Sequence, residues 1–338
     1  MNSREWHLVR RPTGRPDEAD VALVTVEVPE PAPGELLVRN DVMSVEPYMR
    51  GRMSDGPSYA EPYALNAPMT GHAVGEVVAS GDADVPVGAR VLHELGWREL
   101  AVVPTSAARV LPDLDVPPSS WLGVLGLTGF TAYAGLLTVA AAKPGDTVFV
   151  SAAAGAVGAT AAQIAKAMGC TVIGSAGSEA KVRYLVDELG LDAAFSHREP
   201  SVRAALKDAL GRAGTDGIDV YFDNVGGEQL ECALRHMRLF GRLALCGAIA
   251  TYDATEPVPG PRNLLLLIWR RLRMEGFLVG DHEAARPAFE RVMAGWLAEG
   301  RVRSVETVQE GGIDQAWRAF TAMLDGENVG KMVVPLCG

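Results

Sequence analysis

The segment 147–166 constrains the fold more than any other part of the sequence. A compact apolar strand, Thr147–Ser151, leads into a turn of small residues and then into a helix-forming stretch, ATAAQIAK. In this strand–turn–helix context the turn matches the G-x-G-x-x-G fingerprint, with Ala153, Gly155 and Gly158 at the three glycine positions. Gly155 would let the backbone approach a pyrophosphate, and Gly158 would let the helix pack closely on the strand. The flanking elements favour a dinucleotide site, for which the helix N-terminus supplies free N–H groups, over a turn that merely packs a βα unit. The predicted pyrophosphate-binding residues are Gly155, Ala156, Val157 and Gly158.

The end of the next predicted strand indicates which dinucleotide is bound. NAD sites usually carry Asp or Glu about 20 residues further on, where the carboxylate binds the ribose hydroxyls. Here the corresponding stretch, Gly174–Ser178, has no acidic residue, and the basic Lys181 and Arg183 follow it. A carboxylate would repel a 2′-phosphate, whereas a nearby lysine attracts it. The sequence therefore predicts NADPH, with Lys181 beside the 2′-phosphate.

The two parts of the chain differ in pattern on either side of Pro117-Pro118. The first part has short apolar bursts separated by turns, which predict a small and mostly antiparallel β domain. The predicted strands are 22–28, 35–40, 73–80, 89–93 and 98–103. After a small-residue helix expected over 121–142, β-branched bursts alternate with amphipathic stretches, which predicts βαβ units and a parallel sheet. A last strand of that sheet is expected at 273–279, and a strand at 331–336 could return to the first domain.

Composition excludes several classes of function. The net charge of −11 leaves no basic footprint for nucleic acid. The longest apolar run, Leu264–Trp269, is too short to span a bilayer, and the N-terminus lacks the apolar core of a signal peptide. The cysteines show neither metal-ligand spacing nor a disulfide framework, so we expect inert thiols in a cytoplasmic protein. They are Cys170, Cys232, Cys246 and Cys337.

Several blocks along nearly the whole chain identify a family. They are Val45–Met53 (VEPYMRGRM), Gly126–Tyr133 (GLTGFTAY), Val150–Gly158, Tyr221–Gly227 (YFDNVGG), Cys246–Tyr252 (CGAIATY) and Gly326–Lys331 (GENVGK). With these blocks in this order, the chain resembles the zinc-independent medium-chain dehydrogenase/reductases. Within them it is most similar to the group of leukotriene B4 dehydrogenases, prostaglandin reductases and plant alkenal double-bond reductases.

The resemblance implies an α/β fold in which a GroES-like β domain is split around a central Rossmann domain, a doubly wound parallel sheet. The expected boundaries are 1–118 plus 290–338 for the first domain and 119–289 for the second. It also implies NADPH-dependent reduction of the carbon–carbon double bond of α,β-unsaturated ketones and aldehydes. The cofactor-binding residues carried over by motif, besides the turn and Lys181, are His197, Asn224, Cys246, Gly247, Ala248, Ile249, Tyr252, Phe277, Leu278, Val279 and Asn328.

Two positions depart from the family pattern. Ser196-His197-Arg198 stands where the family usually has Asn-Tyr-Lys, so the contribution of His197 near the adenosine phosphate would vary with pH. Glu46 replaces the usual Asp of the first block. The zinc-free assignment is also supported by the residues, because no cysteine occurs before Cys170 and His72 alone could not hold a catalytic metal. We therefore expect no metal site.

A metal-free reductase needs a hydrogen-bond donor for the developing enolate oxygen and a proton for the α-carbon. Tyr252 is the first candidate, because its motif lies beside the nicotinamide in the family. Tyr48 is the second candidate, and Tyr48, Tyr59 and Arg50 are the residues expected to line the substrate pocket.

Other activities remain open at this stage. A quinone oxidoreductase or an NADP-dependent alcohol dehydrogenase would keep the fold and cofactor and change the substrate. A more distant alternative is a non-catalytic NADPH-binding sensor. The apolar edge strand at 273–279 would favour a homodimer, since such edges pair across a two-fold axis.

Overall fold

The computed structural model describes residues 1–56 and 58–336, and Cys337 lies outside them. The chain divides into two compact units. The β unit comprises Met1–Leu122 together with Glu306–Gly338, and the Rossmann unit comprises Gly123–Val305. The second division falls after the expected boundary at 289–290, because helix α8 (Arg286–Ala298) packs within the Rossmann unit. The ring of Phe289 of α8 lies 5.2 Å from that of Phe130, tilted by 44°, and Arg286 lies over the Phe130 ring.

The β unit contains two sheets. A three-stranded sheet has the order β2-β1-β4, and a seven-stranded sheet has the order β15-β16-β3-β5-β6-β8, with β7 also paired to β3. The strands are β1 (Asn2–Leu8), β2 (Val21–Glu27), β3 (Glu35–Ser44), β4 (Ala67–Pro68), β5 (Ala73–Ser80), β6 (Arg90–His93), β7 (Leu100–Pro104), β8 (Arg109–Val110), β15 (Glu306–Val308) and β16 (Lys331–Pro335). The helices are α1 (Tyr48–Arg52) and α9 (Ala316–Leu324), with short 3-10 turns at Glu18–Asp20, Thr105–Ala107, Pro118–Trp121 and Gly312–Gln315.

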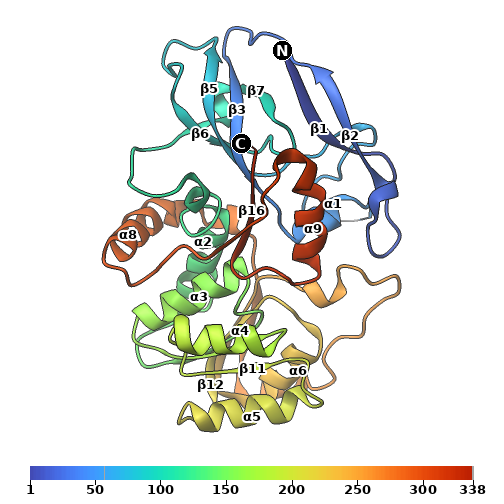
Figure 1. Ribbon diagram of the computed structural model, residues 1–338. Helices are drawn as coiled ribbons and strands as arrows, with labels where there is room; N and C mark the ends of the chain where they lie inside the picture. Colours follow the sequence, from blue (N-terminus) through green and yellow to red (C-terminus); the bar gives the residue numbers. More distant parts are fainter. Residues whose placement is uncertain (57, 337–338) are drawn as a thin grey trace. The chain divides into compact units, whose positions relative to one another are not determined.

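The late strand β16 completes the β unit, as the sequence predicted. It lies beside β3 (Figure 1) and runs antiparallel to it, with Val334 opposite Met43. It also runs parallel to β15. One face of this sheet covers a core that includes Met43, Met49, Trp97 and Phe320, all fully buried. Chain segments from both ends therefore share one hydrophobic core.

The Rossmann unit is built on a six-stranded parallel sheet with the order β11-β10-β9-β12-β13-β14. Its strands are β9 (Thr147–Val150), β10 (Thr171–Ala176), β11 (Ala193–Ser196), β12 (Ile218–Asp223), β13 (Met237–Leu245) and β14 (Arg273–Gly276). Its helices, besides α8, are α2 (Leu127–Tyr133), α3 (Ala156–Ala167), α4 (Glu179–Arg183), α5 (Val202–Arg212), α6 (Gly227–His236) and α7 (Leu265–Arg270). The strand order reverses between β9 and β12, which is the switch point where doubly wound folds bind ligands.

Several elements differ from the sequence-based expectation. Strands β1, β4, β8 and β15 were not predicted. The helix expected over 121–142 is α2 followed by a π-helical segment, Ala134–Val139, because the chain before Leu127 forms turns. Strand β14 ends at Gly276, and the chain then turns into the 3-10 segment Val279–Ala285.

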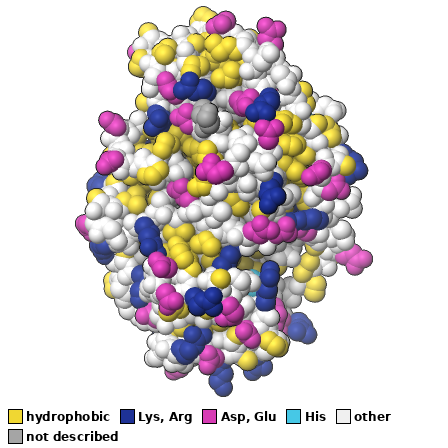
Figure 2. Space-filling model, in the orientation of Figure 1, with side chains coloured by type: hydrophobic (Ala, Val, Ile, Leu, Met, Phe, Trp, Pro, Cys, Tyr) yellow, Lys and Arg dark blue, Asp and Glu magenta, His cyan; other side chains and the backbone are white. Residues whose placement is uncertain are grey.

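The surface carries charges of both signs. Lys and Arg side chains are interspersed with Asp and Glu on the face drawn in Figure 2, so the net charge of −11 is not gathered there into one acidic field.

Within the described residues, no helix combines the length and apolar character that crossing a membrane requires.

Candidate cofactor site and catalytic residues

The turn after β9 is shaped by two close backbone approaches. The Ala153 N–H donates to Ser175 O of the neighbouring strand at 2.8 Å, and Ala152 adopts a positive φ of 48°. A Cβ atom on Gly158 would lie 2.2 Å from Ala152 O, so only glycine lets α3 pack this closely on the turn. Gly155 is the N-cap of α3, which leaves the N–H groups of the first helical turn unused by the helix. The turn therefore has the form that a pyrophosphate requires.

Basic side chains gather at the ends of β10 and β11. Ser178 caps α4 by accepting from the Lys181 N–H at 3.3 Å, and the His197 N–H donates to Ala176 O at 2.9 Å. Burial and the nearby Arg198 guanidinium lower the pKa of Lys181. Burial, followed by Arg198 and Lys181, likewise lowers the pKa of His197. The two predicted 2′-phosphate residues are thus brought together, and Arg198 joins them.

Asp223, at the end of β12, organises the loops around the switch point. Its Oδ1 atom accepts from Tyr221 Oη at 2.7 Å, from Ser151 Oγ at 3.0 Å and from the N–H groups of Val225 and Gly226 at 2.9 Å. Sequence analysis missed this residue, because its role depends on β9 and β12 being neighbours. A buried carboxylate with four donors holds the glycine-rich turn 224–227 in one conformation.

Asn224 is tied to β9 in the same way. Its Nδ2 atom donates to Ser151 O at 2.7 Å, and its N–H donates to Ser151 Oγ at 2.9 Å. These bonds fix the orientation of the amide at the carboxyl end of the sheet, where the sequence predicted the nicotinamide half of the site.

Backbone hydrogen bonds join the segment Cys246–Tyr252 to the turn 223–227. The N–H groups of Cys246 and Gly247 both donate to Asp223 O, at 2.8 and 3.1 Å, and the Ile249 N–H donates to Asn224 O at 3.3 Å. Tyr252 is half-buried, and its hydroxyl lies 3.4 Å from where a Cβ of Gly247 would stand. Burial raises the pKa of the Tyr252 phenol, which therefore stays protonated at neutral pH and can donate a hydrogen bond.

Phe277 leads from β14 toward the central strands. Its ring meets that of Phe222 at 6.4 Å in an edge-on contact, and the absence of a side chain at Gly135 makes room for it. Leu278 is exposed, and Val279 begins the 3-10 segment. The three predicted carboxamide residues thus lie beyond the carboxyl end of β14.

The remaining candidates lie in the β unit. Tyr48 begins α1, and burial, with the Glu46 carboxylate, raises the pKa of its phenol. Arg50 is buried and donates to Gly14 O and to Ser54 Oγ, contacts that stabilise the fold. Tyr59 is 65% exposed. The Asn328 Nδ2 atom donates to Gly330 O at 2.6 Å in the turn before β16.

His72, the residue considered for metal chemistry, lies near Glu46, which departs from the family pattern. Glu46 forms a buried ion pair with Lys331, and His72 lies close enough for its charge to act on the Glu46 carboxyl. Within the described ranges, no three His, Cys, Asp or Glu side chains come together as a metal site would require.

Comparisons with known proteins agree with this architecture. A model described as the N-terminal domain of oxidoreductases matches residues 4–111, and one described as zinc-binding dehydrogenase matches residues 156–295. The 2-alkenal reductase (NADP(+)-dependent) of Nicotiana tabacum is 42% identical, over 95% of this chain and 94% of its own length. The NADPH-dependent curcumin reductase of Escherichia coli (strain K12) is 37% identical, over 100% of this chain and 98% of its own.

A solved structure extends the likeness to three dimensions. CurA from Vibrio vulnificus, in complex with NADPH, superimposes with a TM-score of 0.93 at 38% identity, covering 99% of each chain. The chain belongs to the zinc-independent medium-chain dehydrogenase/reductases. As a member of this family it has the expected α/β fold, with a parallel-sheet Rossmann unit and an N-terminal β unit.

Proposed function

We propose that this protein reduces the carbon–carbon double bond of α,β-unsaturated ketones and aldehydes. The observation that carries the proposal is the half-buried Tyr252, a protonated phenol in a segment bound to the Asn224 turn. The 2-alkenal reductase and the curcumin reductase, both similar over nearly their whole length, support the same substrate class.

The protein is an NADP-dependent oxidoreductase, and its cofactor is NADPH. When bound, NADPH supplies the hydride that adds to the β-carbon of the substrate. We assign its pyrophosphate to the turn Gly155–Gly158 and its 2′-phosphate to Lys181, His197 and Arg198. The glycine cradle at Gly158 and the basic cluster beside an acid-free Gly174–Ser178 fit those two groups. Asn224, Cys246–Tyr252 and Phe277–Val279 are assigned to the nicotinamide half.

Tyr252 is assigned the role of hydrogen-bond donor to the substrate carbonyl oxygen. A donor at that oxygen stabilises the enolate that develops as the β-carbon is reduced. Because burial raises the pKa of this phenol, it keeps its proton until the enolate forms. The proton that finally reaches the α-carbon can come from the same hydroxyl. Tyr48 is the second candidate for this role.

The test is turnover of a 2-alkenal by Tyr252→Phe. We expect kcat to fall about 100-fold, the lower range for loss of a general acid, while the Kd for NADPH stays within about twofold because the phenyl ring remains. Tyr184→Phe is the matched control and should behave like the wild type. Tyr184 lies in the same unit, with the Arg303 guanidinium over its ring. Unchanged turnover in Tyr252→Phe would eliminate Tyr252, and a loss confined to Tyr48→Phe would transfer the role to Tyr48.

A substrate panel separates the alternatives. We expect NADPH oxidation to be faster with an enone than with a quinone. We expect the reverse reaction, NADP+ reduction by an allylic alcohol, to be slower than both. Fastest turnover of the quinone or the alcohol would identify the corresponding activity. Tight NADPH binding without turnover of any of them would instead identify a sensor.

We further propose a homodimer formed across β14. In the described part of the chain β14 has no strand on its outer side, and β13, α7 and their neighbours expose large apolar side chains. These are Leu239, Phe240, Leu264, Leu265, Ile268 and Trp269. Two copies related by a two-fold axis would pair their β14 edges and cover this apolar surface.

We also propose that the protein acts in the cytoplasm. Cys170 and Cys232 are free and buried, and burial raises the pKa of the Cys170 thiol to about 11. Unreactive free thiols are typical of a reducing compartment. Fractionation of the host cell, followed by detection of the protein outside the soluble cytoplasmic fraction, would contradict this assignment.

A further inference from the structure

The imidazole of His197 lies over a glycine at the cofactor end of the sheet. A Cβ on Gly177 would stand 3.3 Å from His197 Cε1, and 3.9 Å from both His197 Nε2 and Arg198 Nε. Gly177 belongs to the turn between β10 and α4, and the His197 N–H is held by Ala176 O at 2.9 Å. The ring is therefore fixed against the turn assigned to the adenosine ribose.

The surroundings of this ring are positively charged. Arg198 from its own loop and Lys181 from α4 are the cations whose fields reach it. Its Nδ1 atom is buried and has no hydrogen-bond partner among the described residues. An imidazole near two cations, with a nitrogen that lacks a partner among the described residues, is suited to an anion that the chain itself does not provide.

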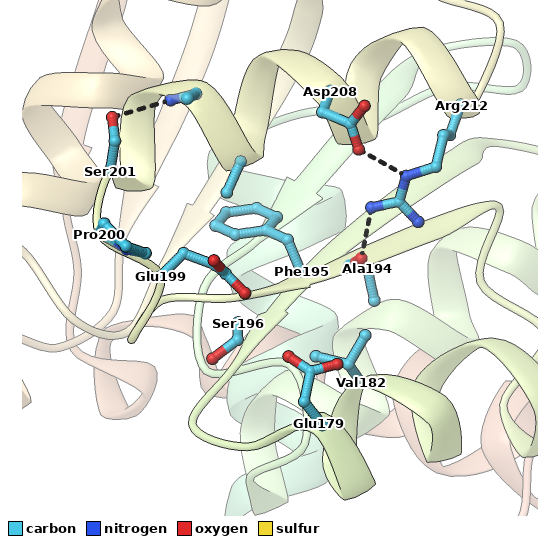
Figure 3. Close-up of a pocket in the computed structure, with 12 residues that line it drawn as sticks. Glu179, Val182, Ala194, Phe195, Ser196, Glu199, Pro200, Ser201, Asp208 and Arg212 are labelled. Carbon is cyan, nitrogen blue, oxygen red and sulfur yellow. Dashed lines mark hydrogen bonds and ion pairs between the residues drawn. The ribbon is translucent and has the colours of Figure 1, made fainter.

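Two carboxylates lie nearby in the chain, one from each flanking element. Glu179 of α4 and Glu199 of the loop after β11 both line a pocket of about 510 Å³ that also includes Ser196 and Arg212 (Figure 3). In that view the two carboxylates point into this pocket beside the edge strand β11. The charges that act on His197 itself are those of Arg198 and Lys181.

We propose that His197 takes up a proton when NADPH binds, which makes it a specificity-determining residue whose discrimination against NADH increases as the pH falls. The inference rests on the placement of the 2′-phosphate proposed above. The step is a proton transfer: solvent or buffer gives up a proton and the ring nitrogen gains an N–H bond, with no oxidation or reduction. The protonated imidazole faces the phosphate dianion as a third cation.

The direction of the effect follows from linkage. Burial, Arg198 and Lys181 lower the pKa of His197 in the free protein, so the ring is neutral at pH 7. A bound phosphate dianion would raise that pKa, because opposite charges favour the protonated ring. Between the two pKa values the complex holds more protons than the free protein, so NADPH affinity rises as the pH falls through this window. NADH lacks the phosphate and should show no such dependence.

The probe is 2′,5′-ADP, which carries the 2′-phosphate without a nicotinamide, so enzymatic activity plays no part. Calorimetric titrations of the full chain at pH 7 in two buffers with different ionisation enthalpies give the number of protons taken up. We expect the wild type to take up about half a proton more than His197→Tyr, whose phenol does not titrate there. The phosphate has its own pKa near 6, but its titration largely cancels in the difference between the two proteins.

A second measurement does not depend on the variant. The Cε1 proton of His197, followed by NMR across pH 5–9, should titrate at a higher pH with 2′,5′-ADP bound than without it. In parallel, the ratio of the Kd for NADH to that for NADPH should fall several-fold from pH 6.5 to pH 8.5 in the wild type. The same ratio should change less in His197→Tyr.

The outcomes separate this inference from the placement on which it rests. Equal proton uptake in both proteins, with weakened binding by Lys181→Ala, would overturn the proton uptake and keep the phosphate site. Unchanged 2′,5′-ADP binding in both Lys181→Ala and His197→Tyr would overturn the placement and the inference together.

Discussion

Glu46 and Lys331 form a buried ion pair between chain segments 285 residues apart. The Lys331 ammonium donates to Glu46 Oε1, which also accepts from Ser44 Oγ at 2.7 Å. Both charged side chains are at least 95% buried. The pair joins the segment before α1 to the first residue of β16. It therefore holds in place the backbone that leads into Tyr48 and the turn that carries Asn328.

Lys331→Met should therefore be strongly destabilising. It leaves the Glu46 carboxylate buried without its partner, a change that typically costs about 3–5 kcal/mol. Chemical denaturation measures the free energy of unfolding. The double variant Lys331→Met/Glu46→Gln should recover most of the loss, because no unpaired charge remains.

The matched control for this prediction is the exposed pair Arg39–Glu76, whose atoms lie 2.7 Å apart. Arg39→Met should cost less than about 1 kcal/mol, as surface pairs do. A Lys331→Met effect as small as that of Arg39→Met would mean that the buried pair does not stabilise the β unit.

Gly158→Ala should disrupt the cofactor turn. The added Cβ would lie 2.2 Å from Ala152 O and 2.9 Å from Ala152 C, and both atoms are backbone that cannot yield without moving the turn. We expect NADPH affinity to fall at least about tenfold, equivalent to about 1.4 kcal/mol. Fluorescence titration with NADPH provides the measurement.

Gly211→Ala is the control for a glycine without such contacts. It lies in α5 with nothing within 4 Å of the added Cβ, so the change should raise stability by roughly 0.5–1 kcal/mol. NADPH binding by this variant should match the wild type. Equal NADPH affinity in Gly158→Ala would show that the turn does not approach the pyrophosphate closely.

Asp223→Asn should loosen the turn 224–227. The substitution keeps the size of the side chain but removes the charge to which four donors are bound, and hydrogen bonds to charged groups contribute about 1.5–3 kcal/mol each. NADPH affinity should fall more than about tenfold. Tyr221→Phe removes only one of the four donors and should change affinity by less than about threefold. If both variants bind NADPH alike, Asp223 does not organise the site.

Acidification should destabilise the β unit through His93. Burial, followed by Arg98 and His72, lowers the pKa of His93 to about 3, so the folded protein holds this ring neutral while the unfolded chain protonates it near 6.5. The unfolded state therefore binds the extra proton, and stability falls by about 1.4 kcal/mol per pH unit below about 6. Unfolding experiments between pH 4 and 8 measure the slope.

His93→Asn should flatten that slope, because the amide does not titrate in this range. The fold should be kept, because Asn Oδ1 can still accept from the Leu95 N–H, which His93 Nδ1 binds at 3.0 Å. An identical slope in wild type and variant would assign the acid sensitivity to other groups.

Trp269→Glu with Ile268→Glu should convert the proposed dimer to a monomer. Both side chains are more than 60% exposed on α7, and two charges on each copy would prevent burial of the patch. Light scattering should report twice the chain mass for the wild type and the chain mass for the variant. Val87→Glu, an equally exposed position in the β unit, should leave the mass unchanged. A monomeric wild type would contradict the dimer.

The Rossmann unit could be predicted closely from sequence because its signals are local. Each strand is a short apolar burst, and each helix follows within a few residues, so β9, the turn and α3 were found together. Strand β1 was missed for a physical reason. Its inward positions include Ser3 and Glu5, which are polar, so the alternation that marks a half-buried strand is hidden.

The parts of the site that were missed depend on contacts between distant residues. Ser151 and Asp223 are joined only because β9 and β12 are neighbours, and no motif spacing records that. The role of Arg50 beside the substrate stays a prediction. Its guanidinium also donates to a carbonyl 36 residues earlier in the chain, a contact that no motif spacing records.

The position of β16 between β15 and β3 has a consequence for folding during synthesis. The Glu46 carboxylate leaves the ribosome 285 residues before Lys331, an interval of roughly 15–60 s at about 5–20 residues per second. Throughout that interval β3 can pair with β5 and β7 but lacks β16 beside it, and Glu46 lacks its counter-ion. The whole of the Rossmann unit is synthesised during the same interval. The β unit is therefore the last to close, and in the nascent chain its incomplete core is the surface that a chaperone would need to protect.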